Sequence, residues 1–185
     1  MLRPSSSSSP KSVIFRLSSK APRIETERLI LRRMSFDDWP DYASMLASKR
    51  SAHMGGPYDT EGAWAMFCRD AAQWDLFGVG ALMMDEKSTG HCIGQVGINF
   101  GPPFPEYELG WLVYPDAEGK GYAFEAATAL RNWAFNARRL PTLVSYIAPE
   151  NDRSITLAGR LGAVLDQTAQ RPDPNDLVFR HARPK

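Results

Sequence analysis

The segment from Glu108 to Leu140 constrains the fold more than any other part of the chain. It opens with an apolar, aromatic run that Pro115 ends, which is typical of a strand. A turn follows that contains Gly119 and Gly121. Beyond it the apolar period changes to that of a helix, at Tyr122, Ala126, Leu130, Trp133 and Ala137. The segment therefore predicts a strand, a glycine loop and a helix.

Such a unit can bind an anion at the start of its helix. The first backbone N–H groups there have no intrahelical partners, and the helix dipole adds a partial positive charge. Gly119 and Gly121 lack a Cβ, so their backbone can approach a phosphate and adopt torsion angles that other residues resist, while Lys120 adds a positive charge. A pyrophosphate is the expected ligand.

Two common phosphate-binding motifs do not fit this loop. A P-loop places Ser or Thr after its lysine, whereas Lys120 is followed by Gly121. A Rossmann fingerprint needs a third glycine and an acid at the end of the next strand. Here the loop continues into Tyr122-Ala123-Phe124, so the match is poor.

A third pattern fits. The segment Leu109–Ala127 resembles the central motif of the GCN5-related N-acetyltransferase (GNAT) family, in its ribosomal-protein-acetylating, RimJ/RimL-like branch: Val-x-Pro, then Gly-Lys-Gly-Tyr-Ala, then Glu-Ala. The phrase Glu25–Arg32 is similar to the opening strand of that branch, and Asn151-x-x-Ser154 before a helix ending in Leu-Gly is a further similarity. The family usually has Gln or Arg where this chain has Glu118.

The resemblance extends from Ile24 to the C-terminus and implies one acetyltransferase domain over residues 24–185. It implies an α/β (α+β) fold: a mixed, mostly antiparallel central sheet flanked by helices, with the glycine loop at the start of the central helix. It also implies acetyl-CoA as donor co-substrate and no metal. The residues expected to contact acetyl-CoA are Leu112, Val113, Tyr114, Gly119, Lys120, Gly121, Tyr122, Ala123 and Asn151.

Acetyl transfer to an amine needs a polarised thioester carbonyl, an acid for the departing thiolate and an unprotonated amine. The resemblance implies that the backbone N–H near Val113 polarises the carbonyl and that the Ser154 hydroxyl is the acid. Glu108 on the central strand is the candidate base, with Glu106 in reserve. The alternatives are that Ser154 belongs to an ordinary capped helix start and that both glutamates are merely solvated.

The composition of the chain limits the class of protein to which it can belong. A chain of 185 residues with 43% hydrophobic content forms one domain, and no apolar run approaches the roughly 20 residues that span a bilayer. Cys68 and Cys92 predict a reducing, cytoplasmic setting and no disulfide framework, and the three histidines show no metal-ligand spacing. A thiol nucleophile at Cys92, beside His91, is disfavoured because strand neighbours point to opposite faces.

The first 24 residues hold five basic residues and no acid, which leaves the remaining chain with a net charge of −4. We expect no nucleic-acid or membrane partner, an amine substrate, and a monomer or homodimer. Residues 1–23, rich in Ser and Pro, read as a disordered basic tail; a misassigned start codon or a mitochondrial transit peptide would give a similar picture.

The remaining elements follow from periodicity and turn residues. Helices are expected from Ser35 or Asp37 to about Ala47 and from Asp59 or Thr60 to about Leu76. Residues 101–105 are predicted to form a turn outside any sheet, because they contain three prolines. Strands are expected at 28–34, 79–84, 93–100, 142–148, 164–165 and 177–180.

These observations predict an N-acetyltransferase that uses acetyl-CoA and acetylates a primary amine, either a protein N-terminus or a small amine. The alternative function is a non-catalytic sensor or subunit that binds acyl-CoA. A nucleotide-binding regulator is a third reading of the same loop.

Overall fold

The computed structural model describes residues 21–184, so the predicted tail lies almost entirely outside the described residues. One eight-stranded sheet organises this part of the chain, in the order β1-β2-β3-β4-β5-β6-β8-β7. All neighbouring strands pair antiparallel except β5 and β6, which pair parallel. The predicted mixed, mostly antiparallel sheet with flanking helices is confirmed.

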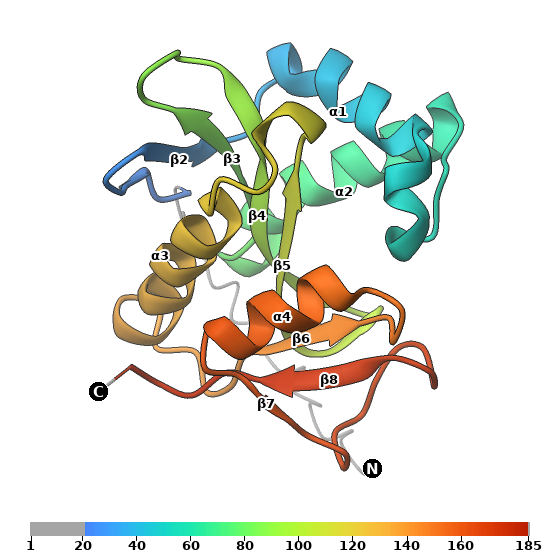
Figure 1. Ribbon diagram of the computed structural model, residues 1–185, viewed down its shortest axis with the longest axis vertical. Helices are drawn as coiled ribbons and strands as arrows, with labels where there is room; N and C mark the ends of the chain where they lie inside the picture. Colours follow the sequence, from blue (N-terminus) through green and yellow to red (C-terminus); the bar gives the residue numbers. More distant parts are fainter. Residues whose placement is uncertain (1–20, 185) are drawn as a thin grey trace, which may run out of the picture.

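The first half of the sheet is antiparallel throughout, with an irregular register near Met83–Asp85 and near Asn99–Gly101. Its strands are β1 (Ile24–Glu25), β2 (Leu29–Arg33), β3 (Ala81–Glu86), β4 (Cys92–Gly101) and β5 (Phe104–Val113). The second half consists of β6 (Val144–Ile147), β7 (Val164–Leu165) and β8 (Leu177–Arg180). In Figure 1 the second half runs across the direction of β4 and β5, so the sheet is strongly twisted where the halves meet.

Helices cover both faces of the sheet. On one face lie α1 (Trp39–Ala47) and α2 (Thr60–Phe77), and on the other lie α3 (Tyr122–Asn136) and α4 (Asp152–Arg160). Three 3-10 turns complete the elements: η1 (Phe36–Asp38), η2 (Lys49–Met54) and η3 (Pro115–Ala117). Alternation along β3 explains the two layers, because Leu82 and Met84 pack with α3 whereas Met83 packs with α1 and α2.

The prediction that residues 101–105 form a turn outside the sheet is correct for Pro102 and Pro103 and wrong for Gly101, Phe104 and Pro105. Gly101 pairs with Phe104, so β4 and β5 form a tight hairpin, and β5 includes Pro105. Pro105 is exposed at the start of the strand, where the register with β4 is irregular between Asn99 and Gly101. A proline is compatible with such a position because it interrupts no regular ladder.

Candidate active site

A cleft of about 1160 Å³ runs through the sheet between β5 and β6. The register of these two strands consists of the single pair Glu108–Val144, beyond which they diverge. The cleft is lined both by residues on the α1/α2 side, such as Asp70 and Asn99, and by residues on the α3/α4 side, such as Ser154 and Leu157. The divergence therefore opens a passage that connects the two faces of the sheet.

The backbone of β5 directs N–H groups toward this passage. The N–H of Tyr114 donates to the carbonyl oxygen of Ile93 in β4 at 2.9 Å. Because successive residues of a strand direct their N–H groups to opposite sides, the N–H groups of Val113 and Trp111 point toward β6, where the described strands have no register pair. Val113 thus lines the cleft with its backbone donor on the open side.

Where β5 and β6 diverge, the buried side chains of Ser145 and His181 take the place of one backbone hydrogen bond between the strands. Ser145 Oγ donates to the carbonyl oxygen of Leu109 at 2.6 Å and lies 3.0 Å from His181 Nε2. Since the hydroxyl has one proton, His181 must donate from Nε2 and carry no proton on Nδ1. Burial lowers the pKa of His181 to about 4, so the ring is neutral and this tautomer is retained near neutral pH.

The glycine loop has the shape that an anion site requires. Gly119 and Gly121 have φ angles of 73° and 81°, in the left-handed region that favours glycine. A Cβ added at Gly119 would meet nothing within 4 Å, so the backbone there is open to a ligand. No side chain caps the N-terminus of α3, which leaves its first N–H groups available. The loop therefore has the open backbone and free donors that an anion site needs.

The opening segment Glu25–Arg32 and the central motif Leu109–Ala127 meet at Glu125. Its carboxylate accepts from Thr26 Oγ1 at 2.5 Å, from the backbone N–H of Arg28 at 2.8 Å and from Arg28 Nε at 2.7 Å. The Arg28 guanidinium also lies 4.5 Å from the centre of the Tyr122 ring, whose hydroxyl donates to Glu86. These contacts fix the start of α3 against the segment before β2 and against the β3–β4 hairpin.

Glu118, the residue that departs from the family pattern, holds two arginines. Its carboxylate forms an ion pair with Arg50 of η2 and another with Arg153 of α4, the latter at 3.0 Å from Oε1 to Nη1. All three residues line the cleft. The loop is therefore joined both to the α1–α2 connection and to the start of α4.

Ser154 lies in the first turn of α4 and lines the cleft. Its hydroxyl accepts from Trp111 Nε1 at 3.2 Å, which directs the oxygen toward β5. Asn151 caps the helix, because its side-chain oxygen accepts from the Ser154 N–H at 3.2 Å. This is the ordinary capping role, and it leaves the two amide N–H donors of Asn151 for a ligand.

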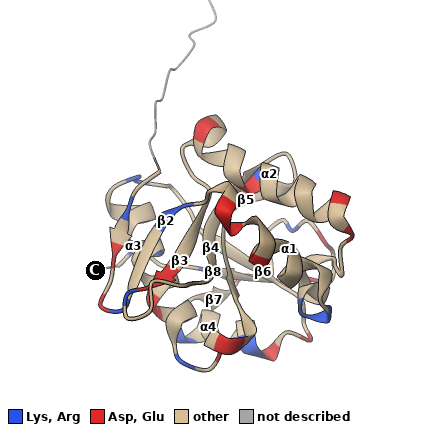
Figure 2. Ribbon diagram, turned by 90° about the horizontal axis from the view of Figure 1, so that it is seen from above, with Lys and Arg blue, Asp and Glu red and all other residues tan. Residues whose placement is uncertain are grey.

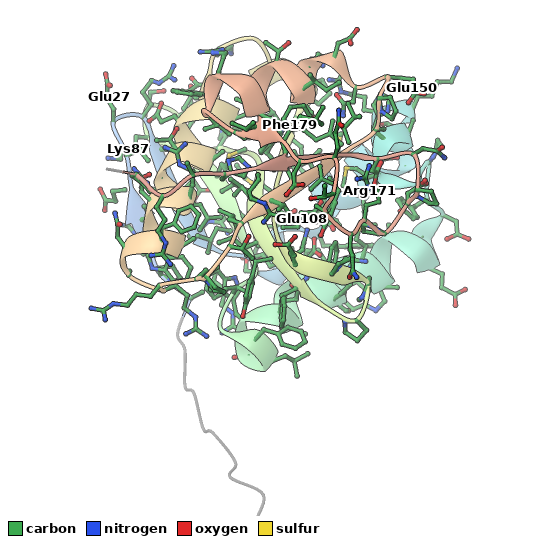
Figure 3. The ribbon with its side chains drawn as sticks, turned by 90° about the horizontal axis from the view of Figure 1, so that it is seen from below. Glu27, Lys87, Glu108, Glu150, Arg171 and Phe179 are labelled. Atoms are coloured by element: carbon green, nitrogen blue, oxygen red, sulfur yellow. The ribbon has the colours of Figure 1, made fainter. Side chains whose placement is uncertain are left out.

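Glu108 lies near the centre of the molecule, where the cleft crosses the sheet (Figure 3). Its carboxylate accepts from Asn99 Nδ2 at 2.8 Å, and Asn99 in turn accepts from Gln73 of α2 at 3.1 Å. Burial raises the pKa of Glu108 to about 7, although the bond from Asn99 opposes the shift. A carboxyl with this pKa can exchange a proton near neutral pH.

Glu106, the reserve base, has a different environment. Arg180 donates to both of its carboxylate oxygens, at 2.7 and 2.8 Å, and Thr142 donates at 2.8 Å. The Arg180 bonds hold the pKa of Glu106 below its usual value, and the residue is not among those that line the cleft. Glu106 therefore ties β5 to β6 and β8.

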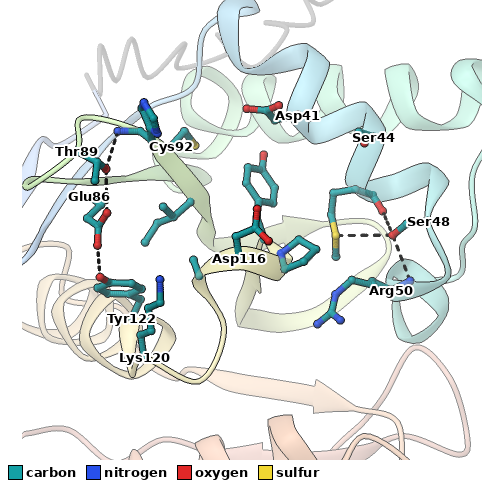
Figure 4. Close-up of a pocket in the computed structure, with 16 residues that line it drawn as sticks. Asp41, Ser44, Ser48, Arg50, Glu86, Thr89, Cys92, Asp116, Lys120 and Tyr122 are labelled. Carbon is teal, nitrogen blue, oxygen red and sulfur yellow. Dashed lines mark hydrogen bonds between the residues drawn. The ribbon is translucent and has the colours of Figure 1, made fainter.

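Two predicted cofactor residues line a smaller cavity of about 490 Å³ on the other side of the loop (Figure 4). These are Tyr114 and Lys120, which line only this cavity, whereas Tyr122 lines both cavities. The Tyr114 hydroxyl is buried there without a hydrogen-bond partner among residues 21–184. Cys92 lines the same cavity, and burial raises the pKa of its thiol to about 11, which disfavours a thiolate. The other predicted cofactor residues line the large cleft: Leu112, Val113, Gly119, Gly121, Tyr122, Ala123 and Asn151.

The α1/α2 side of the cleft contains polar residues that the sequence did not single out. Asp70 of α2 is buried, accepts from Tyr42 Oη at 2.9 Å and from Gln95 Nε2 at 3.3 Å, and has its pKa raised by burial. Gln95 and Asp70 both line the cleft. Asp70 lies on the buried face of α2, among residues whose spacing is that of ordinary core residues. Periodicity therefore could not identify it as a candidate site residue.

Acidic and basic positions are interspersed over the described elements (Figure 2). Among residues 21–184, no helix is long and apolar enough to cross a membrane. Nor does this part of the chain contain a group of three or more His, Cys, Asp or Glu side chains that could hold a metal ion.

Two curated relatives from Bacillus subtilis resemble this chain. YnaD, described as an uncharacterised N-acetyltransferase, is 28% identical over 145 residues, which cover 75% of this chain and 81% of YnaD. YkkB, an uncharacterised protein, is 30% identical over 102 residues; the match covers 51% of this chain and spans only 56% of the length of YkkB.

Among solved structures, an acetyltransferase from Agrobacterium tumefaciens is 55% identical with a TM-score of 0.86, covering 88% of this chain and 95% of that one. Two more distant structures from Vibrio share the fold. A ribosomal-protein-S5-alanine acetyltransferase is 18% identical (TM-score 0.61; 86% and 94% covered), and a spermidine N-acetyltransferase in complex with CoA and spermine is 15% identical (0.66; 84% and 92%).

The profile of the acetyltransferase (GNAT) domain family matches residues 28–164. This range includes the opening strand, the glycine loop and Ser154, and so covers most of the described cleft. The chain therefore belongs to the GNAT acetyltransferase family.

Proposed function

We propose that this N-acetyltransferase uses acetyl-CoA as its donor and acetylates the α-amine of a protein N-terminus, with a small amine as the second candidate acceptor. Membership of the GNAT family and the open glycine loop support the donor. The CoA complex of the distant spermidine acetyltransferase agrees with it.

The observation that carries the choice of acceptor is the pKa of Glu108, about 7, at the point where the cleft crosses the sheet. An α-ammonium group has a pKa near 8, so transfer of its proton to Glu108 is uphill by only about one pKa unit. An alkylammonium group such as that of lysine, with a pKa near 10.4, would face a difference of more than 3 units. Glu108 is thus matched to an α-amine.

Acetyl-CoA, when bound, supplies the acetyl group as a thioester. In our proposal Glu108 accepts the proton that the acceptor ammonium loses, and the Val113 N–H donates to the thioester carbonyl oxygen. As the new C–N bond forms and the C–S bond breaks, the Ser154 hydroxyl donates a proton to the leaving sulfur. The nitrogen loses its second proton to water, water returns a proton to Ser154 and takes up the one held by Glu108, and one proton is released overall. The Trp111 N–H supports this role because it holds the Ser154 oxygen in place.

The donor is tested by thermal unfolding of the protein with acetyl-CoA, CoA, ATP or NAD at equal concentrations. A ligand at about 100 times its dissociation constant stabilises the folded state by about 2.7 kcal/mol. We expect stabilisation by acetyl-CoA and CoA only. Gly121→Glu places a negative side chain on the loop and should abolish the shift in a folded variant; a retained shift would exclude this loop as the binding site.

The acceptor is tested by thiol release in three parallel reactions. These contain a peptide with a free N-terminus and no lysine, the same peptide with an acetylated N-terminus and one lysine, and a polyamine. We expect turnover with the first peptide above the others. Higher turnover with the polyamine would favour the small-amine acceptor, and CoA binding without turnover on any amine would favour the non-catalytic alternative.

A further inference from the structure

The mouth of the cleft contains a cluster of three charged side chains contributed by separate elements. Arg50 comes from η2, Arg153 from α4 and Glu118 from the loop that precedes α3. One carboxylate oxygen, Glu118 Oε1, is shared by both guanidinium groups. Without Glu118, two positive charges would approach the same point of the cleft.

The position of this cluster relates it to the loop. Glu118 directly precedes Gly119, whose backbone is open to a ligand, and Arg153 directly precedes Ser154. The side chains of Arg50 and Glu118 are about one-third and one-fifth exposed (35% and 22%), whereas Arg153 is 66% exposed. The guanidinium groups therefore lie beside the expected phosphate position and are accessible from solvent.

The charges of the two possible partners differ. Glu118 offers each arginine part of a single negative charge, whereas a pyrophosphate diester carries two negative charges and several acceptor oxygens. Guanidinium groups bind phosphate oxygens in paired, charge-assisted hydrogen bonds. The exposed ion pairs with Glu118 are individually weak, because water screens them and side-chain entropy opposes them. A phosphate ligand can therefore displace the carboxylate.

We propose that Arg50 and Arg153 form a phosphate-binding pair of the cleft, which Glu118 occupies in the free protein and releases to the phosphates of the donor. The proposal rests on acetyl-CoA as the donor. It explains how a loop with an acid in place of Gln or Arg can serve an anionic ligand: the acid holds two cations from other elements at the site. Arg50 also links donor binding to η2, which lines the α1/α2 side of the cleft with His53 and Met54.

The test measures equilibrium binding of CoA by calorimetry, with pantetheine, which lacks phosphate groups, as the matched ligand. Arg50→Gln and Arg153→Gln should each weaken CoA binding by about fivefold or more, as loss of one charge near a phosphate predicts, and leave pantetheine binding unchanged. Glu118→Gln should strengthen CoA binding by a similar factor, because it removes the competing charge, and raising the salt concentration should shrink all three effects.

Two control variants change charge nearby without touching the cluster. Lys49→Gln neutralises the neighbour of Arg50 in η2, and Asp116→Asn removes a carboxylate from the same loop; neither side chain forms an ion pair with residues 21–184. Both should change CoA affinity by less than twofold. If Lys49→Gln and Arg50→Gln weakened CoA binding equally, the effect would be one of overall charge. That result would contradict the proposal that Arg50 and Arg153 form a phosphate-binding pair.

Other outcomes are equally decisive. Weaker CoA binding by Glu118→Gln would mean that the carboxylate only ties the walls together, and unchanged CoA affinity in both arginine variants would exclude them as phosphate ligands. Either result overturns this inference and leaves the acetyltransferase function intact. Failure of the unmodified protein to bind CoA would instead overturn the proposed donor and this inference together.

Discussion

The two edges of β5 are built differently. Toward β4, the strand pairs from Val113 to Glu108 in continuous register, and Gly97 and Gly110 face each other within the ladder. Toward β6, it has one register pair and then a side-chain bond from Ser145. The regular edge determines the fold, and the interrupted edge makes the cleft. One edge of β5 thus stabilises the sheet, and the other edge lines the candidate active site.

Substitutions on the two edges of β5 should have different effects. The largest is expected for activity, at Glu108 on the interrupted edge. Glu108→Gln removes the proposed base and should lower kcat/KM by about 10²- to 10³-fold at neutral pH. In the unmodified protein, kcat/KM should rise with pH through about 7 as Glu108 loses its proton, and the variant should lack this rise. An unchanged pH profile would remove Glu108 from the mechanism.

The same variant should be more stable than the original at high pH. Because the folded-state pKa of Glu108 is raised from 4.5 to about 7, its stabilising contribution is complete below pH 4.5 and is lost as the pH rises through 7. Glu108→Gln should therefore gain up to about 3 kcal/mol above pH 7. Glu106→Gln is the matched control and should have the opposite effect on stability. Arg180 lowers the pKa of Glu106, so this carboxylate stabilises the folded state only at higher pH, and its replacement should be destabilising there.

On the regular edge, the expected effect is on stability. Gly94 has a φ of 147°, and an added Cβ would lie 2.2 Å from the carbonyl oxygen of Leu112. Gly94→Ala should lower the free energy of unfolding by about 3 kcal/mol, since the clash is with backbone. Gly110→Ala is the control, because its Cβ would meet nothing closer than 3.8 Å. Equal midpoints for the two variants in urea unfolding would contradict this account of the ladder.

The smallest effect is expected at Ser154. Ser154→Ala should lower kcat by about 10- to 100-fold, the usual range for loss of a general acid, with little change in acetyl-CoA affinity. Trp111→Phe removes the N–H that bonds to Ser154 while the hydroxyl remains. If Ser154 served only to accept this bond, the two variants would have similar rates, and the acid role would be withdrawn.

Periodicity and turn residues predicted the four α-helices, the strands other than β1 and the glycine loop, because each depends on residues close together in the chain. They failed in part at residues 101–105, where the prolines suggested a break but a bulged hairpin accommodates them. The charged cluster at Glu118 could not be predicted from the sequence either. Its arginines come from positions 50 and 153, and only tertiary packing brings them together.

The passage through the sheet has a kinetic consequence. In the proposed mechanism donor and acceptor approach from opposite faces of the sheet and meet beside the β5–β6 divergence, so both would occupy the cleft at once and the acetyl group would need no covalent intermediate on the protein. The raised thiol pKa of Cys92, in a separate cavity, agrees with this. Double-reciprocal plots at several fixed donor concentrations should intersect, as a ternary complex requires, because the two substrates do not exchange places at one entrance.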